Sequence, residues 1–183
     1  MDKVRCFIAL DLPETFRREI VKIQNILREE DLFLGKFTEP ENLHLTLKFL
    51  GEIDEEKVNK VRERLKEVLF EEFSASFGEI GVFSEKFIRI IWIHLIGAEN
   101  LQKKIDEKLS GLFEKEKRFM SHITIARVKR VKDKNKLMEF LRGISYEKKK
   151  FRIDRFYLLK SELFPEGPVY SLIGEYKCMG KIK

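Results

Sequence analysis

The sequence predicts an α+β fold: two pseudo-symmetric lobes of antiparallel sheet, with helices packed outside them and a central cleft between the sheets. Two observations lead to this prediction. Segments with the period of a strand alternate with segments that have the period of an amphipathic helix. The order of these segments then recurs, and a His-apolar-Thr-apolar motif stands at the same place in each copy. We therefore expect a single domain over residues 1–183, with an internal repeat over approximately 5–83 and 87–163.

The first copy contains five predicted elements in the order strand, helix, motif strand, helix, strand. They span residues 5–13, 14–27, 41–51, 54–73 and 74–83. The first helix has apolar residues at helical spacing, and a loop with Gly35 and Pro40 connects it to the motif strand. The second helix opens with acidic residues, which favours an N-terminus at Asp54.

The second copy repeats this order. Its elements span residues 87–97, 98–113, 120–129, 132–144 and 151–163. A closing strand over approximately 168–177 follows the turn sequence FPEGP. Because each copy is too small to bury its own apolar faces, the copies are expected to pack together with equivalent strands facing one another. The two motif strands would then converge on one cleft.

Composition and charge narrow the class of protein. Charged residues make up 37% of the chain and glutamine occurs only twice, a balance that resembles proteins from hot environments. The net charge of +6 favours an anionic partner such as nucleic acid, although a lysine-rich surface explains the charge equally well. No signal peptide or membrane-length apolar run is visible, so we expect a cytoplasmic monomer without a membrane partner. Cys6 and Cys178 are expected to be two buried thiols, with a disulfide as the alternative.

The motif itself carries the functional signal. Since side chains alternate along a strand, His44 and Thr46 share one face, and His122 and Thr124 share the equivalent face of the second motif strand. Two imidazoles that titrate near pH ~6.5 can act as a base and an acid on opposite sides of a phosphorus atom. The threonine hydroxyls can donate hydrogen bonds to the non-bridging oxygens. A single motif would be explained by a core histidine, but two matched copies favour a catalytic pair that needs no metal.

The segments HLTLKFLGE and HITIARV resemble the paired HxTx signatures of the two-histidine (2H) phosphoesterase superfamily. More narrowly the chain resembles the RNA 2′,3′-cyclic phosphodiesterases, also described as 2′-5′ RNA ligases. RCFIALDLPE and LFPEGPVYSLIGEY extend this resemblance over residues 5–177. It implies hydrolysis of a terminal RNA 2′,3′-cyclic phosphate to a 2′-phosphomonoester without metal or cofactor. His44 would be the proton donor to the leaving 3′-oxygen, and His122 the acceptor that activates water.

Two alternatives remain open at this point. An RNA ligase would join a 2′,3′-cyclic phosphate to a 5′-hydroxyl end by the same acid-base exchange, with transfer-RNA halves as natural substrates. A non-catalytic module would use the histidines to bind an RNA end. The cyclic-phosphate RNA end is the expected partner in all three cases.

Four further residues are candidates for substrate binding. Arg127 matches the arginine that often follows the second family motif, but a regular strand would turn it away, so contact with phosphate requires a bend or bulge. Lys48 is in phase with the first motif and is expected to add positive charge at the cleft edge. Phe7 and Tyr170 stand where the family has aromatic residues that hold a nucleobase. The alternative is that both cations end their strands in solvent and both rings belong to the core.

His94, the third histidine, lacks a threonine two residues later and is expected to pack with Trp92 in the core, with a place at the groove as the alternative. No metal site is predicted, because the chain has no H-E-x-x-H motif, cysteine cluster or aspartate-rich motif.

Overall fold

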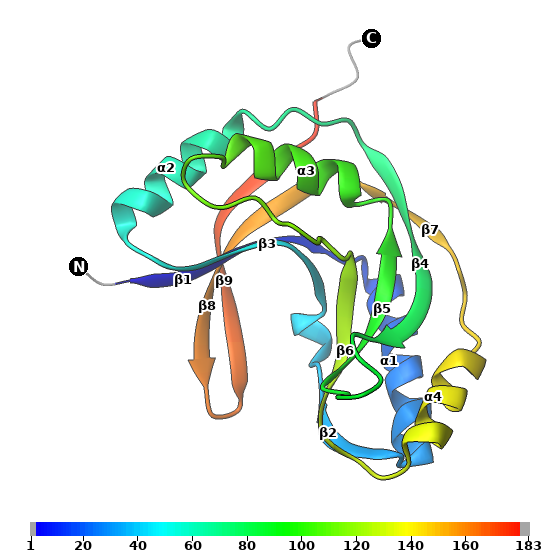
Figure 1. Cartoon of the computed structure of the whole chain (residues 1–183). Helices are drawn as coiled ribbons and strands as arrows, with labels where there is room; N and C mark the ends of the chain where they lie inside the picture. The colour runs from blue at the N-terminus through cyan, green and yellow to red at the C-terminus, as the bar shows by residue number, and fades with distance from the viewer. Residues whose placement is uncertain (1–2, 180–183) are drawn as a thin grey trace.

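A computed structural model describes residues 3–179, which form four α-helices and one curled antiparallel sheet of nine strands (Figure 1). Eight strands follow one another in the order β7-β4-β5-β6-β3-β1-β8-β9, and the remaining strand, β2, pairs with β6. The elements are β1 (Val4–Asp11), α1 (Glu14–Glu30), β2 (Phe33–Phe37), β3 (His44–Ile53), α2 (Glu55–Lys66), β4 (Phe73–Val82), β5 (Ile90–Ile96), α3 (Glu99–Lys108), β6 (His122–Val131), α4 (Lys134–Gly143), β7 (Lys150–Ile153), β8 (Arg155–Phe164) and β9 (Gly167–Lys177).

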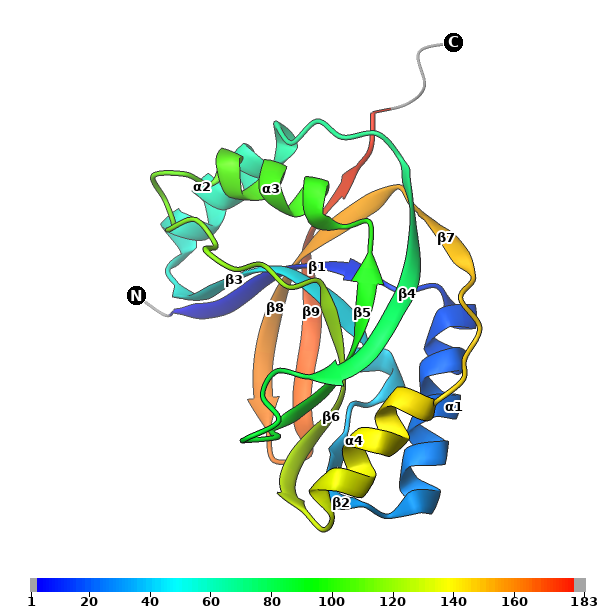
Figure 2. The same cartoon turned by 45° about the vertical axis from the view of Figure 1, so that its right-hand side comes forward.

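The sheet consists of two halves that meet where β3 lies beside β6. A single residue pair, Leu45 with Ile123, joins them. Helices α2 and α3 lie over the half that contains β1 and β3, whereas α1 and α4 lie over the half that contains β4 and β6 (Figures 1 and 2). The helices cover the outer face of the curl, so the other face, called the inner face below, is turned toward the inside of the curl. This arrangement confirms the predicted α+β fold with helices outside the sheets.

The lobes are nevertheless not consecutive halves of the chain. Helix α1 precedes the first motif strand in sequence but packs against β6, the second motif strand. Helix α3 lies in the second part of the chain but packs against β3. Each half of the sheet is therefore covered by helices from both parts of the sequence.

Local sequence explains most of the element boundaries. Helix α1 buries Phe16, Ile20, Ile23 and Leu27 on one face, which is the amphipathic pattern predicted for it. Helix α2 begins after Asp54, whose carboxylate accepts a hydrogen bond from the amide of Lys57 at 2.8 Å, as the acidic start of this segment predicted.

Four segments differ from the prediction. Strand β2 occupies the segment expected to be a loop, because Gly35 lets its backbone approach β6 closely: a Cβ there would lie 2.2 Å from the carbonyl oxygen of Arg127. Helices α2 and α3 end at Lys66 and Lys108, earlier than expected. The strand predicted over 151–163 is two strands, since β7 pairs with β4 in one half of the sheet while β8 pairs with β1 in the other.

The two cysteines are both free thiols, with Cys6 buried in the core and Cys178 partly exposed. Within residues 3–179, no helix has the length and apolar character needed to cross a membrane.

Candidate active site

The four polar residues of the two motifs lie on the inner face of the sheet. His44 is the first residue of β3 and His122 is the first residue of β6, and the Leu45–Ile123 pair brings these two strand starts side by side. Leu45 and Ile123 are fully buried on the helix side. The histidines and threonines on either side of them are only partly buried and face the other way, so the predicted alternation is present in both strands.

Both imidazoles are held in the same way. Nδ1 of His44 lies 2.7 Å from the carbonyl oxygen of Asn42, and Nδ1 of His122 lies 2.7 Å from the carbonyl oxygen of Met120. Because a carbonyl only accepts, Nδ1 carries the proton and donates it in each case, which leaves Nε2 as the nitrogen that exchanges protons. Nε2 of His44 lies 3.1 Å from the hydroxyl oxygen of Thr46.

The surroundings lower the pKa of both imidazoles below the ordinary value of 6.5. Burial is the main cause for His44 and for His122, and the backbone carbonyl at each Nδ1 acts against it. The Asp11 carboxylate also raises the pKa of His44, whereas positive charge on Arg17 or on His122 lowers it. The two imidazoles therefore interact electrostatically, so a proton held by one disfavours a second proton on the other.

Aromatic rings surround His44. The ring of Phe7 is centred 5.0 Å from its imidazole, the ring of Tyr170 is centred 5.2 Å away, and the two rings lie 4.9 Å apart in an edge-to-face contact. The structure thus brings both predicted aromatic residues to the first motif histidine. Tyr170 comes from β9, the closing strand of the chain.

The second histidine has an aromatic neighbour that sequence reasoning missed. Phe83, just after β4, packs edge-on against His122 with ring centroids 4.8 Å apart, and its ring is 5.8 Å from that of Trp92. Phe83 remains 51% exposed despite these contacts. Its only sequence signal was an aromatic residue at the end of a predicted strand.

A bulge in β6 places Arg127 on the inner face. Thr124 pairs with Trp92 and Ala126 pairs with Ile91, which leaves Ile125 as an extra residue. Ile125 and Ala126 are both buried, so the alternation shifts by one and Arg127 faces the same way as the motif residues. The bulge that a phosphate contact by Arg127 requires is therefore present.

The same feature in β3 makes the prediction for Lys48 wrong. Thr46 pairs with Ala9 and Lys48 pairs with Ile8, so Leu47 is the extra residue and Lys48 turns to the helix side. Its ammonium is buried, forms an ion pair with Asp106 of α3 and donates to the carbonyl oxygen of Glu114 at 2.8 Å. Lys48 thus connects β3 to α3 and to the loop that follows α3, and it lies away from the inner face.

The residues beside the two motif histidines differ. Asp11 pairs with His44 across β1 and β3 and forms an ion pair with Arg17. His94 occupies the matching place beside His122, on the inner face, with Nε2 3.7 Å from a carboxylate oxygen of Glu99. His94 is therefore a partly exposed neighbour of the site, while Trp92 is buried as expected.

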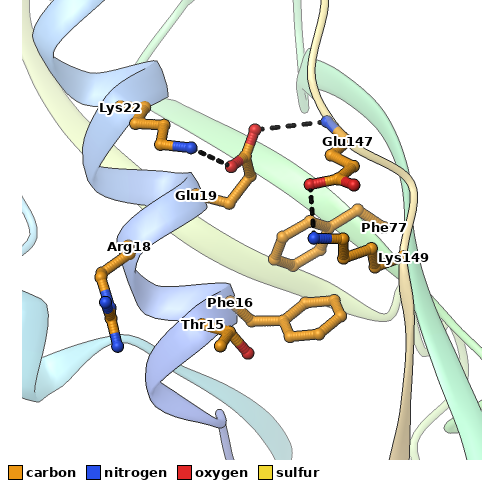
Figure 3. A pocket seen from close by; sticks show the side chains of 8 residues that line it. All are labelled: Thr15, Phe16, Arg18, Glu19, Lys22, Phe77, Glu147 and Lys149. Carbon is orange, nitrogen blue, oxygen red and sulfur yellow. Dashed lines mark hydrogen bonds and ion pairs between the residues drawn. The ribbon is translucent and has the colours of Figure 1, made fainter.

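A separate cavity of about 280 Å³ lies on the outer face, between α1 and the segment before β7 (Figure 3). Four of its charged residues interact with one another: Glu19 accepts from Lys22 at 3.0 Å and from the amide of Glu147 at 3.2 Å, and Lys149 pairs with Glu147. Among residues 3–179, no three histidine, cysteine or acidic side chains come together in a group that could hold a metal ion.

A family model and curated relatives both match most of this chain. The family model described as "LigT like Phosphoesterase" matches residues 10–92 and again 96–170, and each match contains one motif. A protein from Methanocaldococcus jannaschii named RNA 2′,3′-cyclic phosphodiesterase is 38% identical, over 94% of this chain and 100% of the relative. A Thermotoga maritima protein of the same name is 34% identical, over 96% of this chain and 95% of the relative.

Solved structures share the fold. A crystal structure of a Thermus thermophilus protein superimposes with a TM-score of 0.81 at 27% identity and covers 97% of this chain and 99% of its own. The apo form of E. coli LigT gives a TM-score of 0.76 at 18% identity, with coverage of 98% and 100%.

The fold and the paired motifs therefore define a 2H phosphoesterase, and the chain belongs to the LigT-like phosphoesterase family. The protein is accordingly an enzyme that acts on phosphoesters.

Proposed function

We propose that the protein hydrolyses the terminal 2′,3′-cyclic phosphate of RNA to a 2′-phosphomonoester, with His44 and His122 as an acid-base pair. The observation that carries this proposal is the matched geometry of the imidazoles, each with Nδ1 fixed on a carbonyl oxygen at 2.7 Å and Nε2 left to exchange a proton. The names of the relatives supply the substrate class.

The proposed reaction moves two protons and exchanges one bond at phosphorus. Nε2 of His122 takes a proton from water as the water oxygen bonds to phosphorus, the bond from phosphorus to O3′ breaks, and Nε2 of His44 gives its proton to O3′. The product is a 2′-phosphomonoester with a free 3′-hydroxyl. Thr46, Thr124 and Arg127 face the same side and are assigned to the non-bridging oxygens, where negative charge gathers. Every proton has a residue assigned to it, and no step uses a metal or a cofactor.

The different surroundings of the two histidines support these roles. Burial lowers the pKa of His44 overall, but the Asp11 carboxylate acts against this shift and favours the protonated imidazole that a proton donor needs. For His122, burial lowers the pKa and favours the neutral imidazole that a base needs. Both motifs lie on the same chain, so the proposed reaction requires only a monomer. Tyr170 is assigned to the terminal nucleobase because it is partly exposed beside the proposed donor, and Phe7, which is buried, supports the ring of Tyr170.

The test is turnover of an oligonucleotide with a 2′,3′-cyclic phosphate end, measured with EDTA present. We expect His44→Ala and His122→Ala each to reduce turnover by a factor on the order of 100 or more, which is the magnitude of general acid-base catalysis, while RNA binding is retained. Lys66→Ala, on the exposed surface of α2, serves as the control, with turnover close to wild type. Wild-type turnover in either motif variant would contradict the proposal, and binding without any turnover by the wild type would favour a non-catalytic RNA-end module.

Ligation is a second candidate, in which a 5′-hydroxyl of RNA, for example of a transfer-RNA half, replaces water. The observation that favours it is the exposed ring of Phe83 beside His122, which offers a stacking surface on the side from which the nucleophile approaches. The test is to incubate paired RNA halves with the enzyme and to measure joined product. Loss of joining in Phe83→Ala with hydrolysis retained would support an acceptor site there.

A further inference from the structure

Arg5 is a cation on the inner face that neither the motifs nor the proposed reaction use. It alternates with Cys6 and Ile8, which are fully buried on the helix side, so Arg5 faces the same way as Phe7. Its guanidinium carbon lies 4.8 Å from the centre of the Phe49 ring. Phe49 is the residue that the bulge in β3 returns to the inner face, where it is 52% exposed.

The guanidinium of Arg5 is available for a ligand. Within residues 3–179 it has no ion-pair or hydrogen-bond partner, and its cross-strand neighbour Glu52 is not within ion-pair distance. Burial raises the pKa of Tyr170, and positive charge on Arg127 and on Arg5 acts against this shift. Tyr170 in turn packs on Phe7.

The proposed reaction fixes the side on which the rest of the RNA lies. If His44 protonates O3′, the terminal ribose lies toward the half of the sheet that contains β1 and β3. Tyr170, which packs on the buried ring of Phe7, is in the same half and is assigned to the base. Along the RNA from that ribose toward the 5′ end, the first charged group is the phosphate on its 5′-oxygen. Arg127 belongs to the other half, on the strand of His122, and is already assigned to the reacting phosphate.

We propose that Arg5 binds the phosphate on the 5′ side of the terminal nucleotide, and that the enzyme thereby selects RNA ends over cyclic mononucleotides. This inference rests on the proposed hydrolysis of cyclic phosphates. An arginine held over an aromatic ring and unpaired with any carboxylate presents its donors to phosphate oxygens in a fixed orientation.

The experiment compares adenosine 2′,3′-cyclic phosphate with the same molecule phosphorylated at its 5′-oxygen. For the wild type we expect the 5′-phosphate to raise kcat/KM about tenfold, which corresponds to ~1.4 kcal/mol. Arg5→Gln should abolish this preference and leave turnover of the unphosphorylated substrate at the wild-type rate. Arg62→Gln, on the exposed surface of α2, makes the same change in net charge and should keep the preference.

The outcomes separate this inference from the proposed function. A wild type that hydrolyses both substrates equally well, or an Arg5→Gln variant that keeps the preference, overturns the role of Arg5 and leaves the hydrolysis itself supported. Equal losses on both substrates, together with a lowered thermal unfolding midpoint, would assign Arg5 a structural role and also overturn the inference. A wild type without turnover of either substrate overturns the proposed function and this inference with it.

Discussion

Replacing Lys48 with methionine tests the bulge that turns this residue away from the substrate. Methionine keeps the length of the side chain and removes its charge. The side chains of Lys48 and Asp106 are only 4% and 8% exposed, so Lys48→Met leaves a buried carboxylate whose remaining hydrogen bond comes from the amide of Glu116 at 2.6 Å. Removing one partner of a buried ion pair costs about 3–5 kcal/mol. The unfolding free energy of a domain is about 5–15 kcal/mol, so the variant should be severely destabilised.

The assay is urea unfolding of Lys48→Met, Asp106→Asn and the double variant. An asparagine at 106 still accepts from the Glu116 amide, so the double variant has no unpaired buried charge and should recover a coupling energy of about 2 kcal/mol. Lys66→Met is the control, because Lys66 and Glu63 form an exposed pair worth less than about 1 kcal/mol.

Catalysis provides the second readout. Folded Lys48→Met enzyme should have wild-type kcat and KM at low temperature, since its side chain lies on the helix side of β3. A stable Lys48→Met variant with a raised KM would refute the reasoning, because that result is what a lysine at the edge of the substrate site would give.

Three further changes test other parts of the structure. The kcat/KM of the wild type should follow a bell-shaped pH profile with its basic limb below pH ~6.5, because a lowered pKa makes His44 lose its proton at lower pH; a profile that rises monotonically would contradict this. Gly81→Ala should destabilise the fold by about 1–3 kcal/mol in urea unfolding, because the new Cβ would lie 2.7 Å from a ring carbon of Trp92. Asp133→Ala should cost about 1 kcal/mol in the same assay, because the carboxylate caps the first turn of α4, and an unchanged midpoint would show that the cap is not needed.

Periodicity was sufficient to predict most elements of this fold but not how they pair. The helical spacing in α1 and the acidic start of α2 are local signals, and both elements begin where expected. Strand β2 was missed because a central glycine reads as a loop, whereas here Gly35 permits a close approach to β6. Packing of α1 on β6 depends on contacts between distant segments, which no local period encodes.

The candidate site could be predicted as far as the strands stay regular. His44 and His122 lie before the bulges, so alternation placed them correctly on the inner face. Lys48 and Arg127 lie just after the bulges, where one extra residue reverses the face of the side chains that come next. Strict alternation therefore places both cations on the wrong face. It predicts Lys48 on the inner face and Arg127 on the helix side, and the structure shows the reverse.

The repeat supplies two equivalent histidines, but acid-base catalysis needs one of them protonated and the other neutral. The residues around the two imidazoles must therefore give them different pKa values. Asp11 beside His44 has His94 as its counterpart beside His122. Because Asp11 raises the pKa of His44 while Arg17 lowers it, Asp11→Asn removes the favourable charge and leaves the unfavourable one. The pKa of His44 should then fall, so the basic limb of the kcat/KM profile moves to lower pH while the acidic limb, which reports protonation of His122, stays in place. A shift of the acidic limb instead would reverse the roles assigned to the two histidines.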